Sequence, residues 1–502
     1  MAKPKATEAK SAFEAYRQGL SEADVHELSL FFTDVGQHVR LAKEENAKMR
    51  ADFEHALLHY HTTGVPLDVA LERLSPKNLG GFYARRAILW YALDDSAKIY
   101  PLSMRHGQMA VFRLSIYFKQ PIAPALLQLA LTFTIKRFPS FATTVKKGFF
   151  WHYLDTSKRR YAVEPEVDIP CRPLQISSSG SQSFRVVYHH NRVSIEYFHI
   201  LTDAIGGMVF LKTLAAEYLR LCGFPLCVSE GILNINGIPT KSETANEFSR
   251  ADKTEKSAGF VDSPAVQMSG ALSRIKPCRV LHFKMQADRL KEAAAARGAT
   301  VTAYLLALML IAGKSATDER RGTMNILLPV NMRRFYPSDT VRNFAMYCGI
   351  KLAIDEVADV ASTIDNVSQQ LAQKASKRSM SEMMNTTERM ARRLRYVPLF
   401  IKAPAARIGY GFLGDKFFSN TLSNLGVVSM PPQMVEQVDC MDFVLGTTVT
   451  KQTACALVTV GNVAMFSIAK TTVDPSFEET LFALLTEDGL AIAVEGSPQY
   501  ES

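Results

Sequence analysis

Residues 197–204 (YFHILTDA) decide the fold that we predict for this chain. Residues 192–198 (RVSIEYF) alternate as a strand does, and residues 208–221 (MVFLKTLAAEYLRL) have the apolar spacing of a helix. The strand therefore delivers His199 to its end, and Asp203 stands where the helix begins. An imidazole has an ordinary pKa of about 6.5, so it can accept a proton near neutral pH. We take His199 as a candidate general base.

Asp203 needs no contact with a substrate to matter. Its carboxylate can fix the loop after His199, either by pairing with an arginine or by capping the helix. Each residue also has a plainer interpretation. A histidine at a strand end is usually a partly exposed polar residue, and an aspartate before an apolar helix is most simply an N-cap. The HxxxD spacing fits a catalytic site and an ordinary strand-to-helix connection equally well. Other parts of the sequence are therefore needed to distinguish the two.

Strands and helices alternate on both sides of this segment. In the first half we predict a strand at 112–118, a helix at 124–136, and a hairpin of 185–188 and 192–198 around residues 189–191. In the second half we predict strands at 279–285 and 325–330, helices at 287–295, 301–311, 380–394 and 478–485, and a hairpin of 455–460 and 463–468 that turns at Gly461-Asn462. Each half is therefore mixed α/β.

Composition changes suggest the domain boundaries. Residues 1–82 are charged, with apolar residues at helical spacing, and form a helical N-terminal extension. Residues 83–228 form an N-terminal lobe that contains the HxxxD motif, and residues 278–502 form a C-terminal lobe. Between them, residues 229–277 are rich in Ser, Thr, Lys, Glu and Gly and lack periodicity, which is typical of a linker.

Composition also excludes several classes of protein. Hydrophobic residues make up 47% and charged residues 21%, which excludes a disordered chain and a protein with many membrane spans. The most apolar stretch, residues 301–313, is shorter than the roughly 20 residues that cross a bilayer. The seven cysteines contain no CxxC pair and the first residues lack an apolar signal core, so we expect reduced thiols in a cytoplasmic protein.

The net charge and the absence of certain motifs limit the classes of ligand that we expect. The net charge of +9 is mild for 502 residues, and no basic stretch carries the aromatics of a nucleic-acid reader, so we expect no nucleic-acid partner. Anionic small molecules such as coenzyme A, or an acidic carrier protein, fit such a surface. His189-His190 lacks further ligands at metal spacing, and no nucleotide-binding glycine loop occurs. We expect neither a metal nor a resident cofactor.

Residues 198–219 (FHILTDAIGGMVFLKTLAAEYL) resemble the HxxxD(G) segment of the superfamily that includes chloramphenicol acetyltransferase, wax ester synthases and the condensation domains of peptide synthetases. The resemblance is closest to the alcohol O-acetyltransferase branch. Four other stretches agree in order: 90–101 (WYALDDSAKIYP), 137–154 (RFPSFATTVKKGFFWHYL), 328–344 (LPVNMRRFYPSDTVRNF) and 421–426 (TLSNLG). Together they cover about residues 85 to 495.

The resemblance implies an α/β fold of two chloramphenicol-acetyltransferase-like lobes, which form a pseudo-dimer around a central tunnel. It implies that His199 is the base that helps move an acyl group from acyl-CoA, or from a carrier-bound thioester, to an alcohol. Asp203, Gly206 and Gly207 would be structural parts of the motif. The expected partners are acyl-CoA, a small alcohol or amine and, as a donor, an acyl carrier protein.

The chain departs from condensation domains at three places, where Phe198, Ala142 and Ala204 replace a histidine, an arginine and a glycine of their pattern. Residues 442–446 (DFVLG) match the late DFGWG segment of those domains poorly. These changes argue against a peptide-synthetase domain. They leave an amide-forming enzyme and a non-catalytic ligand-binding protein as alternative hypotheses.

Further residues are candidates for the tunnel and for the oxyanion that acyl transfer generates. Ser423 and Asn424 could donate hydrogen bonds to the oxyanion, although Asn424 could instead satisfy local backbone before Gly426. Asn331 and Arg333 could line the tunnel or be a solvated loop. The helix at 380–394 is strongly basic on its outer side, which is usually a solvated face but could contact phosphates; its basic residues are Arg389, Arg392, Arg393 and Arg395.

Overall fold

The hairpin that leads to His199 forms as predicted, inside a mixed sheet. The computed structural model describes residues 6–84, 89–103, 109–174, 183–225, 229, 231–254, 263–275, 277–405, 415–447 and 452–496. The first sheet has the order β12-β2-β7-β6-β5, and its strands are β2 (Val111–Phe118), β5 (Val163–Pro165), β6 (Phe184–His189), β7 (Arg192–Phe198) and β12 (Val438–Leu445). Every residue of β7 after Arg192 is buried, so the end of this strand is a well-anchored place for His199.

Two helices and a small sheet complete the first lobe. α6 (Pro124–Ile135) packs against α7 (Ala204–Leu221), and α7 packs on β2. The small antiparallel sheet has the order β1-β4-β3, with β1 at Trp90–Ala92, β3 at Thr143–Lys147 and β4 at His152–Thr156. After β1 the chain makes two short helices, η2 (Ala97–Ile99) and α5 (Tyr100–Ser103), which reach back to His199.

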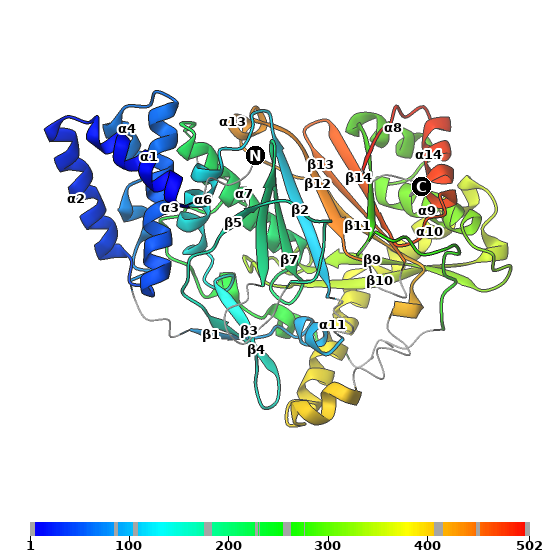
Figure 1. Ribbon diagram of the computed structural model, residues 1–502. Helices are drawn as coiled ribbons and strands as arrows, with labels where there is room; N and C mark the ends of the chain where they lie inside the picture. The colour runs from blue at the N-terminus through cyan, green and yellow to red at the C-terminus, as the bar shows by residue number, and fades with distance from the viewer. Residues whose placement is uncertain are drawn as a thin grey trace.

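The second sheet has the order β10-β9-β11-β13-β14-β8-β15. Its strands are β8 (Arg279–Gln286), β9 (Thr323–Asn331), β10 (Ala345–Ala353), β11 (Asn420–Val427), β13 (Thr453–Val460), β14 (Val463–Lys470) and β15 (Ala493–Gly496). The main helices of this half are α8 (Ala287–Ala296), α9 (Val301–Ser315), α10 (Val360–Lys374), α11 (Lys377–Arg393) and α14 (Ser476–Glu487). Figure 1 shows the two sheets side by side, with α8, α9 and α14 beyond the second. The mixed α/β architecture of two sheets is as predicted.

The sheets do not divide the chain at one point. β12 comes late in the sequence, between β11 and β13, yet it pairs antiparallel with β2 of the first sheet, with Met441 opposite Ile116. The boundary predicted at 278 assigns β12 to the second lobe, whereas the structure adds it to the first sheet. Side chains also hold β12 in the first sheet, because Asp442 accepts hydrogen bonds from Ser115 and Tyr117 of β2, both at 2.7 Å.

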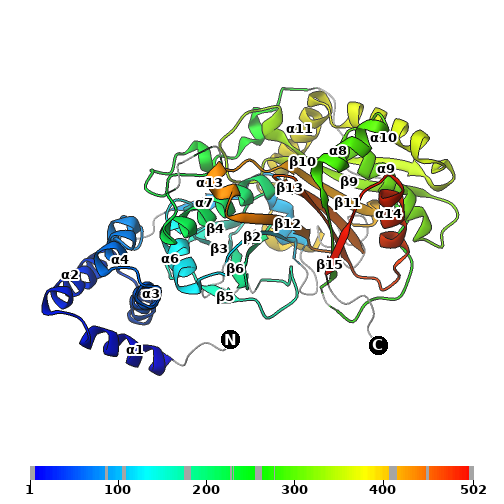
Figure 2. The same ribbon diagram turned by 90° about the horizontal axis from the view of Figure 1, so that it is seen from above.

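The N-terminal extension is helical, as predicted, and it packs on the first lobe. Its helices are α1 (Ala6–Gln18), α2 (Glu22–His38), α3 (Lys43–Thr62) and α4 (Leu67–Arg73). α3 lies against α6, where the ring of Phe53 meets that of Phe133 at 6.1 Å. The Tyr60 hydroxyl donates to the backbone oxygen of Leu221 at 2.6 Å. Figure 2 shows the four helices on the outer side of α6.

The segment at 229–277 contains only short helical turns in its described part, η3 (Ser242–Thr244) and η4 (Glu247–Arg250). It is nevertheless attached to both lobes. Glu243 pairs with Arg137 of the first lobe at 2.5 Å, and its backbone oxygen accepts from the Val341 N–H at 2.8 Å. The predicted linker therefore packs along the junction of the two halves.

Among the helices that the structure describes, none is both long and apolar enough to span a membrane alone. α8 and α9 pass that test together, but they meet at a bend of 78°. Gly298, in the break between them, has a left-handed φ of 66°. α9 is packed into the core of the second lobe.

Candidate functional site

His199 lies between two aromatic rings at the end of β7. Its backbone N–H donates to the oxygen of Ala110 at 2.8 Å, which continues the pairing of β7 with β2 by one residue. The ring of Tyr100 stacks on the imidazole with centroids 4.7 Å apart, and the ring of Phe112 meets it at 5.2 Å edge to face. The side chain is held from several sides but is still partly exposed.

Asn343 fixes which imidazole nitrogen carries the hydrogen. The Asn343 amide nitrogen donates to the backbone oxygen of His199 at 2.9 Å and lies 3.3 Å from a carboxylate oxygen of Asp94. A carbonyl oxygen can only accept, so this contact orients the amide and turns its own oxygen towards Nδ1 of His199, 2.9 Å away. Nδ1 must then carry the hydrogen, and Nε2 keeps a lone pair.

The surroundings favour the uncharged form of the His199 imidazole. Burial is the main cause that lowers its pKa below 6.5, because the charged form loses water. Its own backbone carbonyl, the carboxylates of Asp203 and Asp94, and the amide of Asn343 oppose this effect without overcoming it. A neutral imidazole with a free Nε2 is the form that a general base requires.

Asp203 plays both structural roles that the sequence suggested. One carboxylate oxygen accepts from the Gly206 N–H at 2.9 Å and so caps α7. The other accepts from Arg333 at 2.8 Å and from the Phe344 N–H at 2.7 Å. Arg333 also donates to the backbone oxygens of Thr340 and Arg342, both at 2.7 Å. Asp203 thereby ties the loop after His199 in the first lobe to the 340–344 segment of the second.

The glycines of the motif allow this close approach. A Cβ on Gly206 would lie 2.1 Å from the backbone oxygen of Val341, so no side chain fits there. That same oxygen accepts from the Thr202 hydroxyl at 2.6 Å. A Cβ on Gly207 would meet the rings of Tyr197 and Phe112 at 3.2–3.3 Å. The segment that carries Asn343 therefore crosses the start of α7 in direct backbone contact.

Of the other sequence-predicted site residues, three take part in hydrogen-bond networks and one is buried in a strand. Asn331 accepts from the Arg333 N–H at 3.1 Å and from its guanidinium at 3.3 Å, so both belong to the network of Asp203. Asn424 accepts from the Gly426 N–H at 2.8 Å and donates to Thr302 at 3.0 Å. Ser423 is buried in β11 opposite Ala456 of β13.

Asp94 and Tyr100 were not singled out from the sequence. Asp94 is fully buried, and burial raises its pKa while Arg342 opposes the shift. It accepts from the Ala97 N–H at 2.8 Å and from Ser96 at 2.9 Å. Both residues belong to the 90–101 stretch whose resemblance was recognised. Asp94 helps to orient the amide of Asn343, which lies 249 residues away in the sequence. No local sequence pattern predicts this contact.

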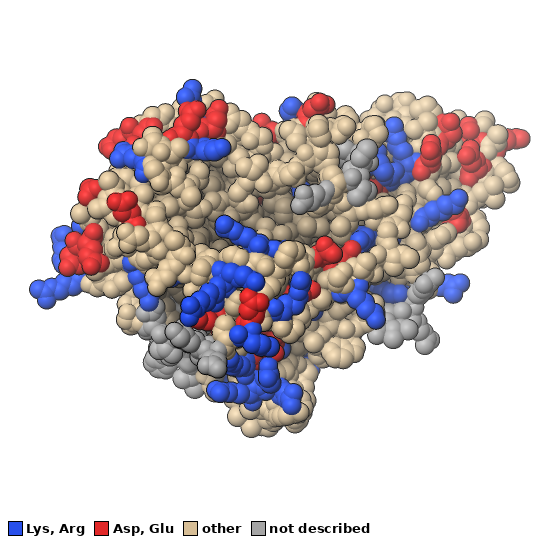
Figure 3. Space-filling view, turned by 180° about the vertical axis from the view of Figure 1, so that it is seen from behind, with Lys and Arg blue, Asp and Glu red and all other residues tan. Residues whose placement is uncertain are grey.

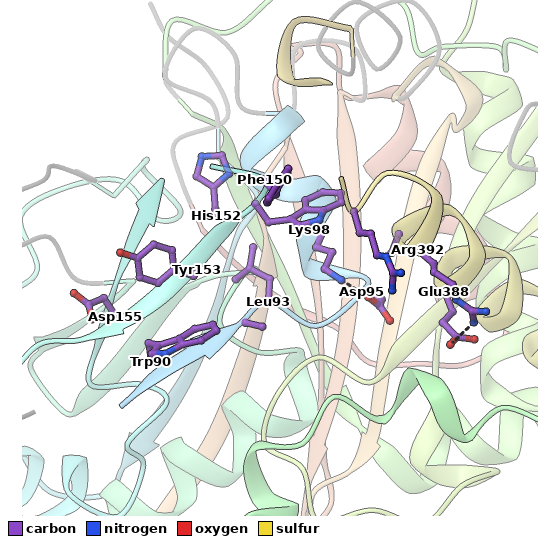
Figure 4. A pocket seen from close by; sticks show the side chains of 14 residues that line it. Trp90, Leu93, Asp95, Lys98, Phe150, His152, Tyr153, Asp155, Glu388 and Arg392 are labelled. Carbon is purple, nitrogen blue, oxygen red and sulfur yellow. Dashed lines mark hydrogen bonds and ion pairs between the residues drawn. The ribbon is translucent and has the colours of Figure 1, made fainter. Parts of the chain in front are cut away.

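A hollow of about 770 Å³ adjoins the same stretch. Its walls come from β1, from the hairpin of β3 and β4, and from α11, as Figure 4 shows. Four aromatic residues line it: Trp90, Phe150, Trp151 and Tyr153. His199 is not among its lining residues, so the hollow is a feature separate from the imidazole site. Within the described ranges, no group of three or more His, Cys, Asp or Glu residues is placed to hold a metal ion.

Comparison with known proteins identifies similar structures but no similar sequences. No protein-family model and no curated protein matches the chain in sequence. The trichothecene 15-O-acetyltransferase TRI3 from Fusarium sporotrichioides is 12% identical, with a TM-score of 0.53 over 79% of this chain and 95% of its own. TRI101 from F. graminearum, solved with coenzyme A and T-2 mycotoxin, is 10% identical, with a TM-score of 0.56 over 80% and 99%.

A condensation domain has the same architecture. The first condensation domain of the calcium-dependent antibiotic synthetase is 13% identical, with a TM-score of 0.52 over 81% of this chain and all of its own. At such identities the likeness concerns the fold, and the chemistry has to be argued from the residues of this chain.

Proposed function

We propose that this chain, whose fold is that of the chloramphenicol-acetyltransferase-like and condensation-domain superfamily, transfers an acyl group from a thioester to an alcohol, with His199 as general base. The observation that carries the proposal is the contact of Nδ1 of His199 with Asn343, because it leaves Nε2 free to accept a proton. This contact supports the proposal more directly than the fold does, since one fold can support several functions.

The proposed reaction conserves protons and needs no redox step. Nε2 of His199 takes the proton of the acceptor hydroxyl while the oxygen attacks the thioester carbonyl. The tetrahedral intermediate then collapses, the carbon–sulfur bond breaks, and the imidazolium returns the proton to the departing thiolate. The lowered pKa of His199 favours both the neutral starting form and the release of the proton. Tyr100 and Phe112 hold the ring in one orientation throughout.

The proposed reaction also needs a hydrogen-bond donor for the oxyanion of the tetrahedral intermediate. We keep Ser423 as the candidate donor, because the amide of Asn424 is already engaged with Gly426 and Thr302. We propose that the reaction uses no resident metal or redox cofactor. We keep the cytoplasm as the expected compartment, because the described cysteines are free thiols and most of them are buried.

The nature of the neighbours supports acyl-CoA as donor. TRI101 was solved with coenzyme A, and TRI3 is named as an O-acetyltransferase, which favours an alcohol acceptor. The condensation-domain neighbour keeps an amine acceptor and a carrier-protein donor as the second candidate. The same histidine serves both reactions, so only the acceptor distinguishes them.

The test is release of free coenzyme A, measured by mass spectrometry. Short, medium and long acyl-CoAs are offered with a panel of alcohols and amines to the wild type, to His199→Ala and to His189→Ala. His189 is a matched control, because it lies exposed at the far end of the same hairpin. We expect acceptor-dependent release by the wild type and the control, and a loss of at least 100-fold in His199→Ala.

Full activity in a folded His199→Ala variant would contradict the proposal. Product masses decide between ester and amide. Binding of acyl-CoA without turnover of any acceptor would favour the non-catalytic alternative.

A further inference from the structure

Large apolar side chains are exposed together beside the hollow. Phe149, Tyr396 and Phe400 are 66%, 70% and 69% exposed, and Phe150 is 38% exposed. We call these four residues the aromatic rim. Their rings contact one another: Phe149 meets Phe150 at 4.8 Å and Phe400 at 6.5 Å, and Phe150 meets Tyr396 at 6.3 Å. An exposed cluster of this kind usually marks an interaction site.

The rim is held in place by both halves of the chain. Phe149 and Phe150 occupy the turn between β3 and β4, and Tyr396 and Phe400 follow α11. The Leu399 N–H donates to the backbone oxygen of Phe149 at 2.8 Å, and the ammonium of Lys402 lies 3.1 Å from the ring centre of Trp151. These contacts fix the backbone and leave the rings outside, so their exposure is a property of the fold.

The rim is continuous with the hollow. Phe150 belongs to both, and behind it Trp90, Trp151 and Tyr153 line the walls. Figure 4 shows Phe150 beside Lys98, with Trp90 and Tyr153 on the neighbouring strands. An apolar group that reached the rim would therefore have an aromatic cavity next to it.

The charges around the rim are mainly positive. The acidic residues that line the hollow are each paired with a basic one: Asp95 with Lys98, Asp155 with Lys146 at 2.5 Å, and Glu388 with Arg392 at 2.7 Å. Lys147, Arg393 and Arg395 are exposed nearby and add positive charge that these carboxylates do not balance. Figure 3 shows Lys and Arg side chains gathered over the lower part of the molecule, where Figure 1 draws α11.

We propose that the aromatic rim and its basic residues dock on the surface of a lipid bilayer that contains anionic headgroups. Aromatic side chains favour the boundary between headgroups and acyl chains, and lysine and arginine are attracted to anionic lipids. The docked protein would hold the mouth of the hollow at the bilayer surface. Docking does not depend on the acyl-transfer chemistry proposed above.

A second copy of the chain fits the same surface less well. A two-fold contact would bring each rim against its own copy, and with it Lys147, Arg393 and Arg395 against the same residues. Like charges at that distance oppose association, whereas an anionic surface is complementary to them. The charge therefore favours an anionic bilayer over a second copy, and the exposed aromatic rings suit the headgroup boundary of that bilayer.

The test is sedimentation of the full chain with vesicles of phosphatidylcholine alone, or with one quarter phosphatidylglycerol. We expect a partition coefficient at least tenfold higher on the anionic vesicles, and a decrease of at least fivefold when salt is raised from 0.1 to 0.5 M. The variants Phe149→Ser/Phe400→Ser and Arg393→Gln/Arg395→Gln should each lower binding at least fivefold. Val167→Ser/Ile238→Ser is the matched control, because these side chains are 84% and 87% exposed and lie outside the rim.

Equal binding of the wild type, both rim variants and the control would overturn the proposal. So would a wild type that ignores anionic vesicles but sediments in the ultracentrifuge as a dimer that the rim variants convert to monomers, which would identify a second copy as the occupant. His199→Ala should bind vesicles as the wild type does, so this inference and the proposed function fail separately. Circular dichroism and thermal melting confirm that each variant is folded.

Discussion

Nδ1 of His199 lies 2.9 Å from the side-chain oxygen of Asn343, although 144 residues separate the two in sequence. The histidine ends a strand of the first sheet, and the asparagine precedes a strand of the second. The proposed base is therefore oriented only when the two halves of the chain meet.

Removal of this contact should slow the chemical step. We expect Asn343→Ala to lower kcat by about 10- to 100-fold with little change in KM, because the imidazole loses its preferred tautomer but the substrate site stays. Asn343→Asp keeps an acceptor beside Nδ1 and adds negative charge, so it should raise the pKa of His199 and move the acidic limb of the kcat profile to higher pH. Steady-state kinetics from pH 5 to 8 measure both. A normal kcat in Asn343→Ala would show that Asn343 does not position His199 for the reaction.

The ion pair of Asp203 with Arg333 should be a stability determinant. Arg333→Met leaves a buried carboxylate without its cation, so we expect the free energy of unfolding to fall by ~3–5 kcal/mol. Arg289→Met removes an exposed pair with Glu292 and should cost less than ~1 kcal/mol. Urea denaturation measures both. Similar costs in the two variants would show that the buried pair is not what joins the loop to the 340–344 segment.

Two glycines should respond in opposite ways to the same added methyl group. In Gly206→Ala the new Cβ would clash with the Val341 oxygen, and we expect a loss of ~1–3 kcal/mol or more. Gly36 lies inside α2 with nothing within 4 Å of an added Cβ, so Gly36→Ala should stabilise the protein by ~0.5–1 kcal/mol. Thermal melting compares them. A neutral Gly206→Ala would mean that the two lobes can separate locally at this contact.

Stability should fall as the solution becomes mildly acidic. Burial lowers the pKa of both His199 and His282, so below about pH 6.5 the unfolded chain binds protons that the folded chain does not. The contribution of these histidines is therefore complete above pH 6.5 and is lost as pH falls towards their folded pKa values. The free energy of unfolding in urea, measured at pH 7.5 and pH 5.5, checks the sign. A double variant, His199→Ala/His282→Ala, should show a smaller difference between the two pH values.

The elements of the fold were predicted well where the pattern is local. The β6–β7 and β13–β14 hairpins were found from alternation and a turn, and α7 was found from apolar spacing after Asp203. Both structural roles expected of Asp203 are observed, because a cap is a local feature and an arginine partner is a common one.

The rest depends on contacts between distant segments. The hydrogen bond between Asn343 and His199 joins residues that are far apart in the sequence, and no local pattern predicts it. Arg333 was a tunnel candidate, whereas its guanidinium is used by Asp203 and by backbone oxygens. β12 was not predicted as a strand, and its place in the first sheet follows from its pairing with β2, far away in the sequence, and from the partners of Asp442.

The position of β12 has a consequence for synthesis of the protein on the ribosome. Ser115 and Asp442 are 327 residues apart, so the β2 edge has no neighbour on that side until most of the chain has been made. At ordinary translation rates this wait lasts roughly 15–65 s. An open strand edge can pair with other nascent chains during that time. The first lobe expressed alone should therefore aggregate, and in the cell its nascent form is a natural client for chaperones.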